Sequence, residues 1–186
     1  MMYSDIDIKK AIESGDLKVE PFVPEMIKSA SLTMHLGEKL LRPIPGTLID
    51  VKKKQVPKYE EIIITGDNPY CMNPGDFVLG HTLQKVTVGQ NLGFFIEGRS
   101  TLARIGLTIV QTAMLVYPGH TNRGVTLELA NHGNNPILLY PNMKVARAAL
   151  IELKTTSSCT YDEEGKYRDQ EEVGPPIFSK EIQKFD

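Results

Sequence analysis

Short apolar runs, broken by glycine, proline and asparagine, recur along most of the chain. Runs of this kind that end at turn-forming residues are typical of β-strands. The pattern predicts strands at 31–36, 61–65, 77–81, 92–97, 106–110, 125–130, 137–140 and 145–152. Many short strands preceded by one helix favour a β-barrel or jelly roll over a parallel α/β sheet. The predicted fold class is therefore mainly β.

The expected helix lies at the N-terminal end of the chain. Ser4 is a suitable N-cap residue, and Asp7 would lie in the first turn, where the helix dipole favours negative charge. The apolar positions 8, 11 and 12 share one face of such a helix. Gly15 is expected to end it, because glycine readily adopts the left-handed conformation of a helix C-terminus.

The composition of the chain changes near residue 155. Residues 155–158 are polar and residues 162–172 are heavily charged, so this part has little apolar surface to bury. Segments of such composition stay mobile until a ligand or partner orders them. We predict one β domain over residues 1–154, including the N-terminal helix, and a mobile C-terminal lid or tail over residues 155–186.

Charge and composition exclude several classes of function. The formal net charge is -2, and the aromatic content is 7% with no tryptophan, which argues against binding to nucleic acid. Cys71 and Cys159 stand far apart and form no disulfide framework, which is typical of a reducing compartment. No apolar run has the length of a membrane span or a signal peptide. The expected location is the cytoplasm, with no membrane partner.

The histidines do not form a recognisable metal-binding motif. His35, His81, His120 and His132 lack the H-x-E and H-E-x-x-H spacings, and no cysteine pair accompanies them. Zinc sites that activate water normally need such clustered nitrogen and sulfur ligands. No protein metal site, and in particular no zinc, is predicted.

The segment 98–104 concentrates polar side chains directly after a predicted strand. It reads Gly-Arg-Ser-Thr-Leu-Ala-Arg and carries two guanidinium groups and two hydroxyls. Guanidinium forks and hydroxyl donors suit the oxygens of a polyphosphate. An ordinary surface turn would have the same composition, so both interpretations stay open on this pattern alone.

Glu128 is the carboxylate best suited to acid–base chemistry. Strand alternation places it on one face with Thr126 and Ala130, opposite the apolar positions 125, 127 and 129. Small or apolar neighbours favour a confined pocket, in which a carboxylate can transfer protons. The alternative is a solvent-exposed face of an edge strand.

Several motifs, in the same order, resemble those of the dCTP deaminase family within the dUTPase-like superfamily. Residues 98–107 resemble the family motif G-[RK]-S-S-L-x-R-x-G-L, and Thr-Leu-Glu-Leu-Ala-Asn at 126–131 follows it. Residues 165–170, with Gly174-Pro175, resemble the K-Y-x-x-Q…G-P lid of the family. The resemblance covers nearly the whole chain and includes the opening segment 3–8.

This resemblance implies a distorted β-barrel of the dUTPase-like type that assembles as a homotrimer with active sites between subunits. It implies metal-independent hydrolytic deamination of dCTP to dUTP and ammonia, with Mg²⁺ bound only through the triphosphate. The implied catalytic residues are Glu128, Ser100 and Ala113. The implied substrate-binding residues are Arg99, Ser100, Thr101, Arg104, Tyr117, Tyr161, Lys166 and Gln170.

One departure from the family pattern concerns the sugar site. Tyr117 stands where the family has an aspartate that contacts the deoxyribose, and a phenol can donate a hydrogen bond or stack but carries no negative charge at neutral pH. Two alternatives therefore stay open. One is a dUTPase or a bifunctional enzyme that also splits the triphosphate, and the other is a non-catalytic nucleotide-binding trimer.

Overall fold

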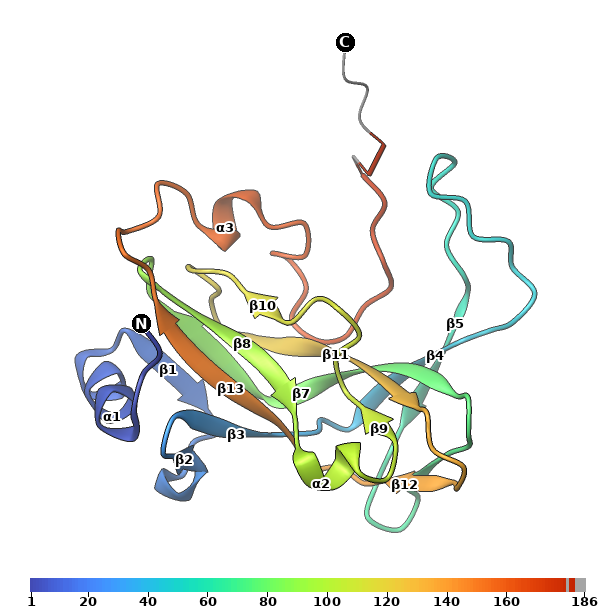
Figure 1. Ribbon diagram of the computed structural model, residues 1–186. Helices are drawn as coiled ribbons and strands as arrows, with labels where there is room; N and C mark the ends of the chain where they lie inside the picture. The colour runs from blue at the N-terminus through green and yellow to red at the C-terminus, as the bar shows by residue number, and fades with distance from the viewer. Residues whose placement is uncertain (180, 183–186) are drawn as a thin grey trace.

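Strands are the main regular secondary structure in the computed structural model, which describes residues 1–179, 181 and 182 (Figure 1). Each predicted strand overlaps an observed strand, and the predicted helix is α1, so the mainly β fold class is confirmed. The elements follow in the order α1 (Asp5–Ser14), β1 (Leu17–Glu20), η1 (Pro24–Met26), β2 (Ile27–Lys28), β3 (Ser31–His35), β4 (Lys39–Pro43), β5 (Tyr59–Ile63), β6 (Tyr70–Met72), β7 (Phe77–Val88), β8 (Leu92–Gly98), α2 (Ser100–Ala103), β9 (Leu107–Thr108), β10 (Leu115–Val116), β11 (Arg123–Asn131), β12 (Ile137–Leu139), β13 (Lys144–Glu152) and α3 (Tyr161–Glu164).

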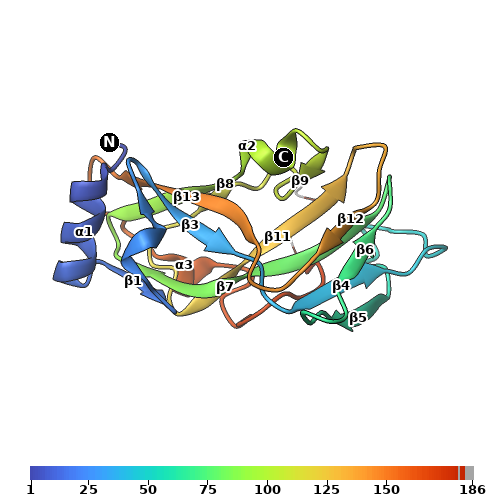
Figure 2. The same cartoon turned by 90° about the horizontal axis from the view of Figure 1, so that it is seen from below.

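The strands form separate antiparallel sheets. A six-stranded sheet has the order β5-β4-β7-β11-β9 with β1 also paired to β7, and a five-stranded sheet has the order β10-β8-β13-β3-β2. β6 and β12 form a two-stranded sheet. Figure 2 shows α1 at one end of the molecule and β4, β5, β6 and β12 at the other. Over the described residues the strand pairings show these sheets and no closed barrel. The distorted barrel and the trimer stay predictions.

Helix α1 begins and ends where the sequence predicts. The Asp7 N–H donates to Ser4 Oγ at 3.3 Å, and the Ser4 N–H donates to Asp7 Oδ2 at 3.0 Å, which completes a capping box. Gly15 follows the helix with φ of 84°, a left-handed conformation that suits glycine. Ile8 is fully buried, so the helix is fixed to the β domain by its apolar face.

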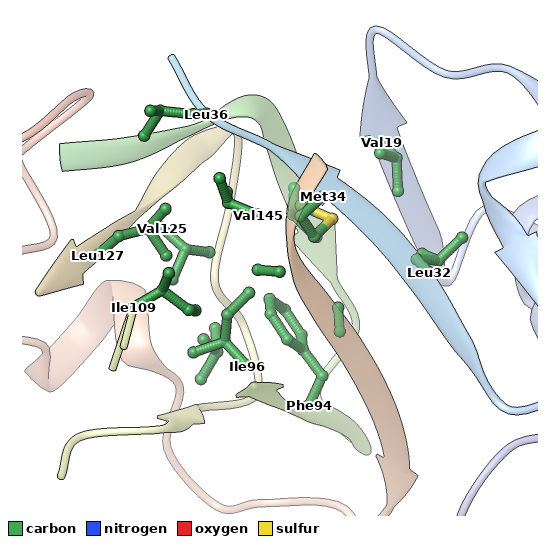
Figure 3. Close-up of a cluster of buried hydrophobic side chains, with 14 of the residues drawn as sticks. Val19, Leu32, Met34, Leu36, Phe94, Ile96, Ile109, Val125, Leu127 and Val145 are labelled. Atoms are coloured by element: carbon green, nitrogen blue, oxygen red, sulfur yellow. The ribbon is translucent and has the colours of Figure 1, made fainter. Parts of the chain in front are cut away.

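The larger of two apolar clusters joins the two larger sheets. Figure 3 shows Phe94 and Ile96 of β8 near Val125 and Leu127 of β11, and all four side chains are buried. Burying each such side chain contributes about 1.5–3 kcal/mol. Because successive side chains of a strand point to opposite faces, this core fixes the orientation of the remaining positions of β8 and β11.

The C-terminal segment is described up to residue 182, with residue 180 excepted. Residues 180 and 183–186 of the predicted tail lie outside the described residues, and the mobility of the tail stays a prediction.

None of the helices in the described part of the chain is long and apolar enough to cross a membrane.

Three partly or fully buried histidines make the stability of the fold depend on pH. Burial lowers the pKa of His35, His81 and His120 below the usual value of about 6.5. As the pH falls below that value, the unfolded chain binds protons before the folded chain does. We therefore expect the contribution of these histidines to the free energy of unfolding to be fully present above about pH 6.5. The free energy of unfolding should then decrease as the pH falls toward about 5.5. Urea unfolding at a series of pH values measures it.

A matched pair of variants isolates the histidine contribution. His120→Gln removes a buried imidazole and should flatten the dependence on pH, whereas His132→Gln changes an exposed side chain and should leave it as in the wild type. An unfolding free energy that is constant between about pH 7 and about pH 5.5 would contradict the prediction.

Candidate active site

Glu128 lies in the middle of β11 with its carboxylate held against a neighbouring segment. The Gln111 N–H donates to Glu128 Oε2 at 3.0 Å, and the Glu128 N–H donates to the Ile109 carbonyl at 2.9 Å. On its other side Glu128 is in register with Leu79 of β7. The strand is therefore flanked on both sides here, and the alternative of an exposed edge strand is wrong. The predicted alternation is confirmed, since Val125, Leu127 and Leu129 are buried and Glu128 is partly exposed.

The segment after β9 brings Ala113 into the same region. Gln111, two positions before it, is tied to Glu128, and its side-chain Nε2 also donates to Thr108 Oγ1 at 3.2 Å. Met114, directly after it, accepts a hydrogen bond from the Ile96 N–H at 2.8 Å. Ala113 is thus an exposed residue between two anchored positions, two residues after the Gln111 that binds the Glu128 carboxylate.

The residues of the polar turn lie at the end of β8. Arg99 occupies the N-cap position of α2, and Ser100, Thr101 and Arg104 are exposed in or just after this short helix. Leu102 packs against the core and holds the helix in place. In the described part of the chain, no hydrogen bond joins this turn to Glu128. The chain therefore places Arg99, Ser100, Thr101 and Arg104 together in one turn, without a hydrogen bond to Glu128 among the described residues.

Gly106, two residues after the polar turn, lies directly against the backbone of His132 and Gly133. Gly106 has φ of +88°, and a Cβ on it would lie 2.2 Å from the Gly133 nitrogen. The His132 N–H donates to the Gly106 carbonyl at 2.8 Å. Only glycine fits this contact, which explains the glycine of the sequence motif in physical terms.

The C-terminal segment lies across the face of β11 that carries Glu128. Gln170 Nε2 donates to Thr126 Oγ1 at 3.2 Å, and the Gly124 N–H donates to the Glu171 carbonyl at 3.2 Å. Thr126 is two positions before Glu128 and therefore on the same face of the strand. The structure thus places Gln170 next to the candidate catalytic strand.

Arg123 at the start of β11 anchors this segment, and the sequence reasoning missed it. Its guanidinium donates to the Arg168 carbonyl at 2.6 Å, pairs with the Asp162 carboxylate and lies 5.5 Å from the centre of the Tyr161 ring. Burial, the largest single contribution, would raise the pKa of Asp162, but hydrogen bonds from Thr121 and Arg123 outweigh it and lower that pKa. One sequence signal for Arg123 was available. It stands at a position that alternates in step with Val125 and Leu127, which predicts a buried arginine that needs a partner.

Tyr117 and Tyr161 form an aromatic pair beside this anchor. Their rings are stacked with centroids 6.3 Å apart and planes 8° from parallel, and the His120 ring lies 5.8 Å from Tyr161. Burial raises the pKa of Tyr161. Tyr117 remains 54% exposed, so one face of the pair is open to a ligand.

Within the described part of the chain, Lys166 forms no hydrogen bond or ion pair with Tyr117, Tyr161 or Glu128. Its ammonium group forms an ion pair with Glu181 of the same segment. Among residues 1–179, 181 and 182, no three histidine, cysteine, aspartate or glutamate side chains gather closely enough to hold a metal ion.

Comparison with known proteins gives consistent matches. Residues 2–153 match the family model described as dCTP deaminase-like. A Corynebacterium diphtheriae protein named "dCTP deaminase, dUMP-forming" is 37% identical over 164 residues, which are 87% of each chain. A Natronomonas pharaonis protein named "dCTP deaminase" is 33% identical over 181 residues, covering 94% of this chain and 92% of that one.

The fold also resembles a solved structure. The crystal structure of 2'-deoxycytidine 5'-triphosphate deaminase from Agrobacterium tumefaciens superimposes with a TM-score of 0.62 at 17% sequence identity. The match covers 80% of this chain and 47% of that one. At this identity, the likeness concerns the fold alone.

Proposed function

The chain belongs to the dCTP deaminase-like family, and on this basis we propose that it is an enzyme that removes the amino group of dCTP by hydrolysis. One observation carries the proposal, namely the partly enclosed Glu128 carboxylate, held by the Gln111 N–H on a strand covered by the C-terminal segment. A carboxylate fixed in this way beside a ligand-accessible backbone suits a general base.

Glu128 carries the proton transfers in the proposed reaction. It takes a proton from a water molecule while the water oxygen adds to C4 of the cytosine ring, and it passes this proton to the ring nitrogen N3. Glu128 then takes the proton of the new C4 hydroxyl and gives it to the amino group, which leaves as ammonia while the C4 carbonyl forms. Water and dCTP give dUTP and ammonia, and no metal ion takes part in these proton transfers.

Ser100 and Ala113 orient the reacting groups in this proposal. The Ser100 hydroxyl and the backbone at Ala113 would hold the water molecule and the oxygen at the tetrahedral carbon. Removing one preorganised donor of this kind typically lowers the rate by about 10²–10³-fold. Because Ser100 lies on α2, apart from the Glu128 of its own chain, we propose that a neighbouring subunit of a homotrimer supplies it.

The triphosphate would bind to the same polar turn. Arg99, Thr101 and Arg104 offer guanidinium and hydroxyl donors, which suit phosphate oxygens better than they suit a metal ion. Mg²⁺ would enter with the substrate and be held by the phosphate oxygens. This turn and Glu128 would then face each other across the subunit boundary.

The C-terminal segment would complete the site around the nucleotide. Gln170 already lies beside the Glu128 strand, and Tyr161 with Lys166 would close over the triphosphate. The exposed face of Tyr117 would stack on the sugar or donate a hydrogen bond to its hydroxyl group. A cytoplasmic location and the absence of a nucleic-acid partner stay predictions.

A second candidate reaction follows from the names of several relatives. Proteins named "dCTP deaminase, dUMP-forming" include the Corynebacterium diphtheriae protein. A product of that kind requires hydrolysis of the triphosphate in addition to deamination, with pyrophosphate as the leaving group. The polar turn that binds the triphosphate would serve either reaction.

Product analysis with dCTP, CTP, dUTP and dTTP separates these possibilities. We expect ammonia from dCTP, at one molecule for each nucleotide consumed. Pyrophosphate released together with ammonia would establish the dUMP-forming reaction, whereas an intact dUTP product would establish simple deamination. Tight nucleotide binding without turnover of any of the four would overturn the proposal and favour a non-catalytic trimer.

A further inference from the structure

The outward face of the five-stranded sheet carries two arginine side chains. Arg99 belongs to the proposed triphosphate site, and Arg147 has no role in the proposed reaction. Arg147 of β13 is in register with Thr33 of β3 on one side and with Glu97 of β8 on the other. Its neighbours Ala146 and Ala148 are buried in the core, so Arg147 points away from the core. Arg147 Nη1 donates to Thr33 Oγ1 at 2.5 Å, which fixes the guanidinium on this face.

Arg99 lies on the same face, one step further along β8. Ile96 is buried and Glu97 is exposed, and the backbone at Arg99 is still extended, with φ of -105° and ψ of 136°. Alternation therefore continues past the end of the strand and places Arg99 beside Arg147 as a diagonal neighbour. Two guanidinium groups thus share one patch of the sheet.

This patch has no carboxylate bound to it in the described part of the chain. Neither Arg99 nor Arg147 forms a salt bridge there, although Glu97 lies directly opposite Arg147. Arg99 Nη1 is buried and has no hydrogen-bond partner. Burial, followed by the nearby charge of Arg99, lowers the pKa of Arg147. Buried donors without partners are costly, so a bound group is expected to satisfy them.

The surroundings of the patch add positive charge. Lys144 and His35 are in register with each other at the end of β13 and β3, next to this face. The positive charges of Lys144 and Arg99 both reach His35, whose pKa is lowered mainly by burial. The local field therefore attracts an anion, although the whole chain has a formal net charge of only -2.

We propose that Arg147 and Arg99 form a binding site for a phosphate group, with Arg147, held in place by the buried Thr33, as a ligand that no sequence motif indicates. Two guanidinium forks offer the donor geometry that phosphate oxygens accept. The phosphate belongs either to the triphosphate of the proposed substrate or to a separate phosphate-bearing anion. The first assignment rests on the proposed function and adds Arg147 to its triphosphate site, whereas the second is independent of the proposed function.

Titration calorimetry of the full chain with inorganic pyrophosphate tests the site. Arg147→Met keeps the aliphatic stem and removes the charge-assisted hydrogen bonds, so pyrophosphate affinity is expected to fall by about tenfold or more. Glu97→Gln removes the opposing carboxylate and is expected to tighten binding. Arg42→Met is the matched control, since Arg42 lies in the other sheet, pairs with Glu60 and should leave affinity unchanged.

The outcomes separate this site from the proposed reaction. Pyrophosphate that competes with dCTP on the Glu128→Gln variant would assign the site to the substrate triphosphate, and simultaneous binding would assign it to a separate anion. Wild-type chain that does not bind pyrophosphate, or Arg147→Met that binds it as the wild type does, would overturn the site. A change in oligomeric state of Arg147→Met without any change in pyrophosphate affinity would assign the patch to a subunit contact instead. None of these results depends on ammonia release.

Discussion

Replacing Glu128 with glutamine is expected to lower the rate of ammonia release from dCTP by about 10²–10⁴-fold, the range that general acid–base catalysis contributes. Glutamine has nearly the same shape, and its amide oxygen still accepts the hydrogen bond of the Gln111 N–H. The fold and the nucleotide-binding groups should therefore persist. What is lost is the ability to accept a proton from water and to return it to the amine.

Steady-state kinetics and calorimetry together check this prediction. The affinity of Glu128→Gln for dCTP should stay close to that of the wild type, because the phosphates provide most of the contacts. Glu61→Gln is a matched control, since it changes an exposed carboxylate that pairs with Lys39 on another strand. If Glu128→Gln keeps appreciable turnover, another group transfers the protons and the assignment is wrong.

Substitution of Arg123 by methionine is expected to release the C-terminal segment from the body of the molecule. The variant loses hydrogen bonds to the Arg168 carbonyl and to Asp162, and the contact with the Tyr161 ring. Hydrogen bonds that involve a charged group contribute about 1.5–3 kcal/mol each. The partly exposed Asp162 side chain reduces the value of that bond, because solvent screens it. We expect a rise in KM for dCTP of about tenfold or more.

Hydrogen exchange over residues 157–173 measures the release directly. Faster exchange in Arg123→Met, with unchanged exchange in the core strands, would separate the loss of docking from a general loss of stability. Arg42→Met again serves as the control, because it removes an exposed ion pair elsewhere. Exchange of this segment at the wild-type rate would show that Arg123 does not hold it.

Local patterns were sufficient to predict much of the fold. The helix N-cap at Ser4, the helix end at Gly15 and the alternation around Glu128 depend on neighbours within a few residues. The pairing of strands depends on contacts between distant segments, such as Leu17 with Val88, which no short window of sequence contains. For the same reason the sequence predicted a β-barrel or jelly roll without the order of its strands.

The candidate site was predictable only in part. Glu128 and Gln170 could be named from motifs, and the structure brings both to β11. The anchoring role of Arg123 depends on a partner 39 residues away, Asp162, and the patch at Arg147 depends on strands β3 and β8 lying on either side of β13. These relationships arise from tertiary packing. The sequence signal at Arg123, its phase with the buried positions of β11, does not indicate which residues it contacts.

Mass spectrometry of the nucleotide formed from dCTP in heavy-oxygen water, with a zinc chelator in excess over the protein, tests the central claim most directly. Hydrolytic deamination by Glu128 predicts one heavy oxygen atom at C4 of the uracil ring for each ammonia released, at a rate that the chelator does not change. A product without the label at C4, or no ammonia under these conditions, would contradict the account.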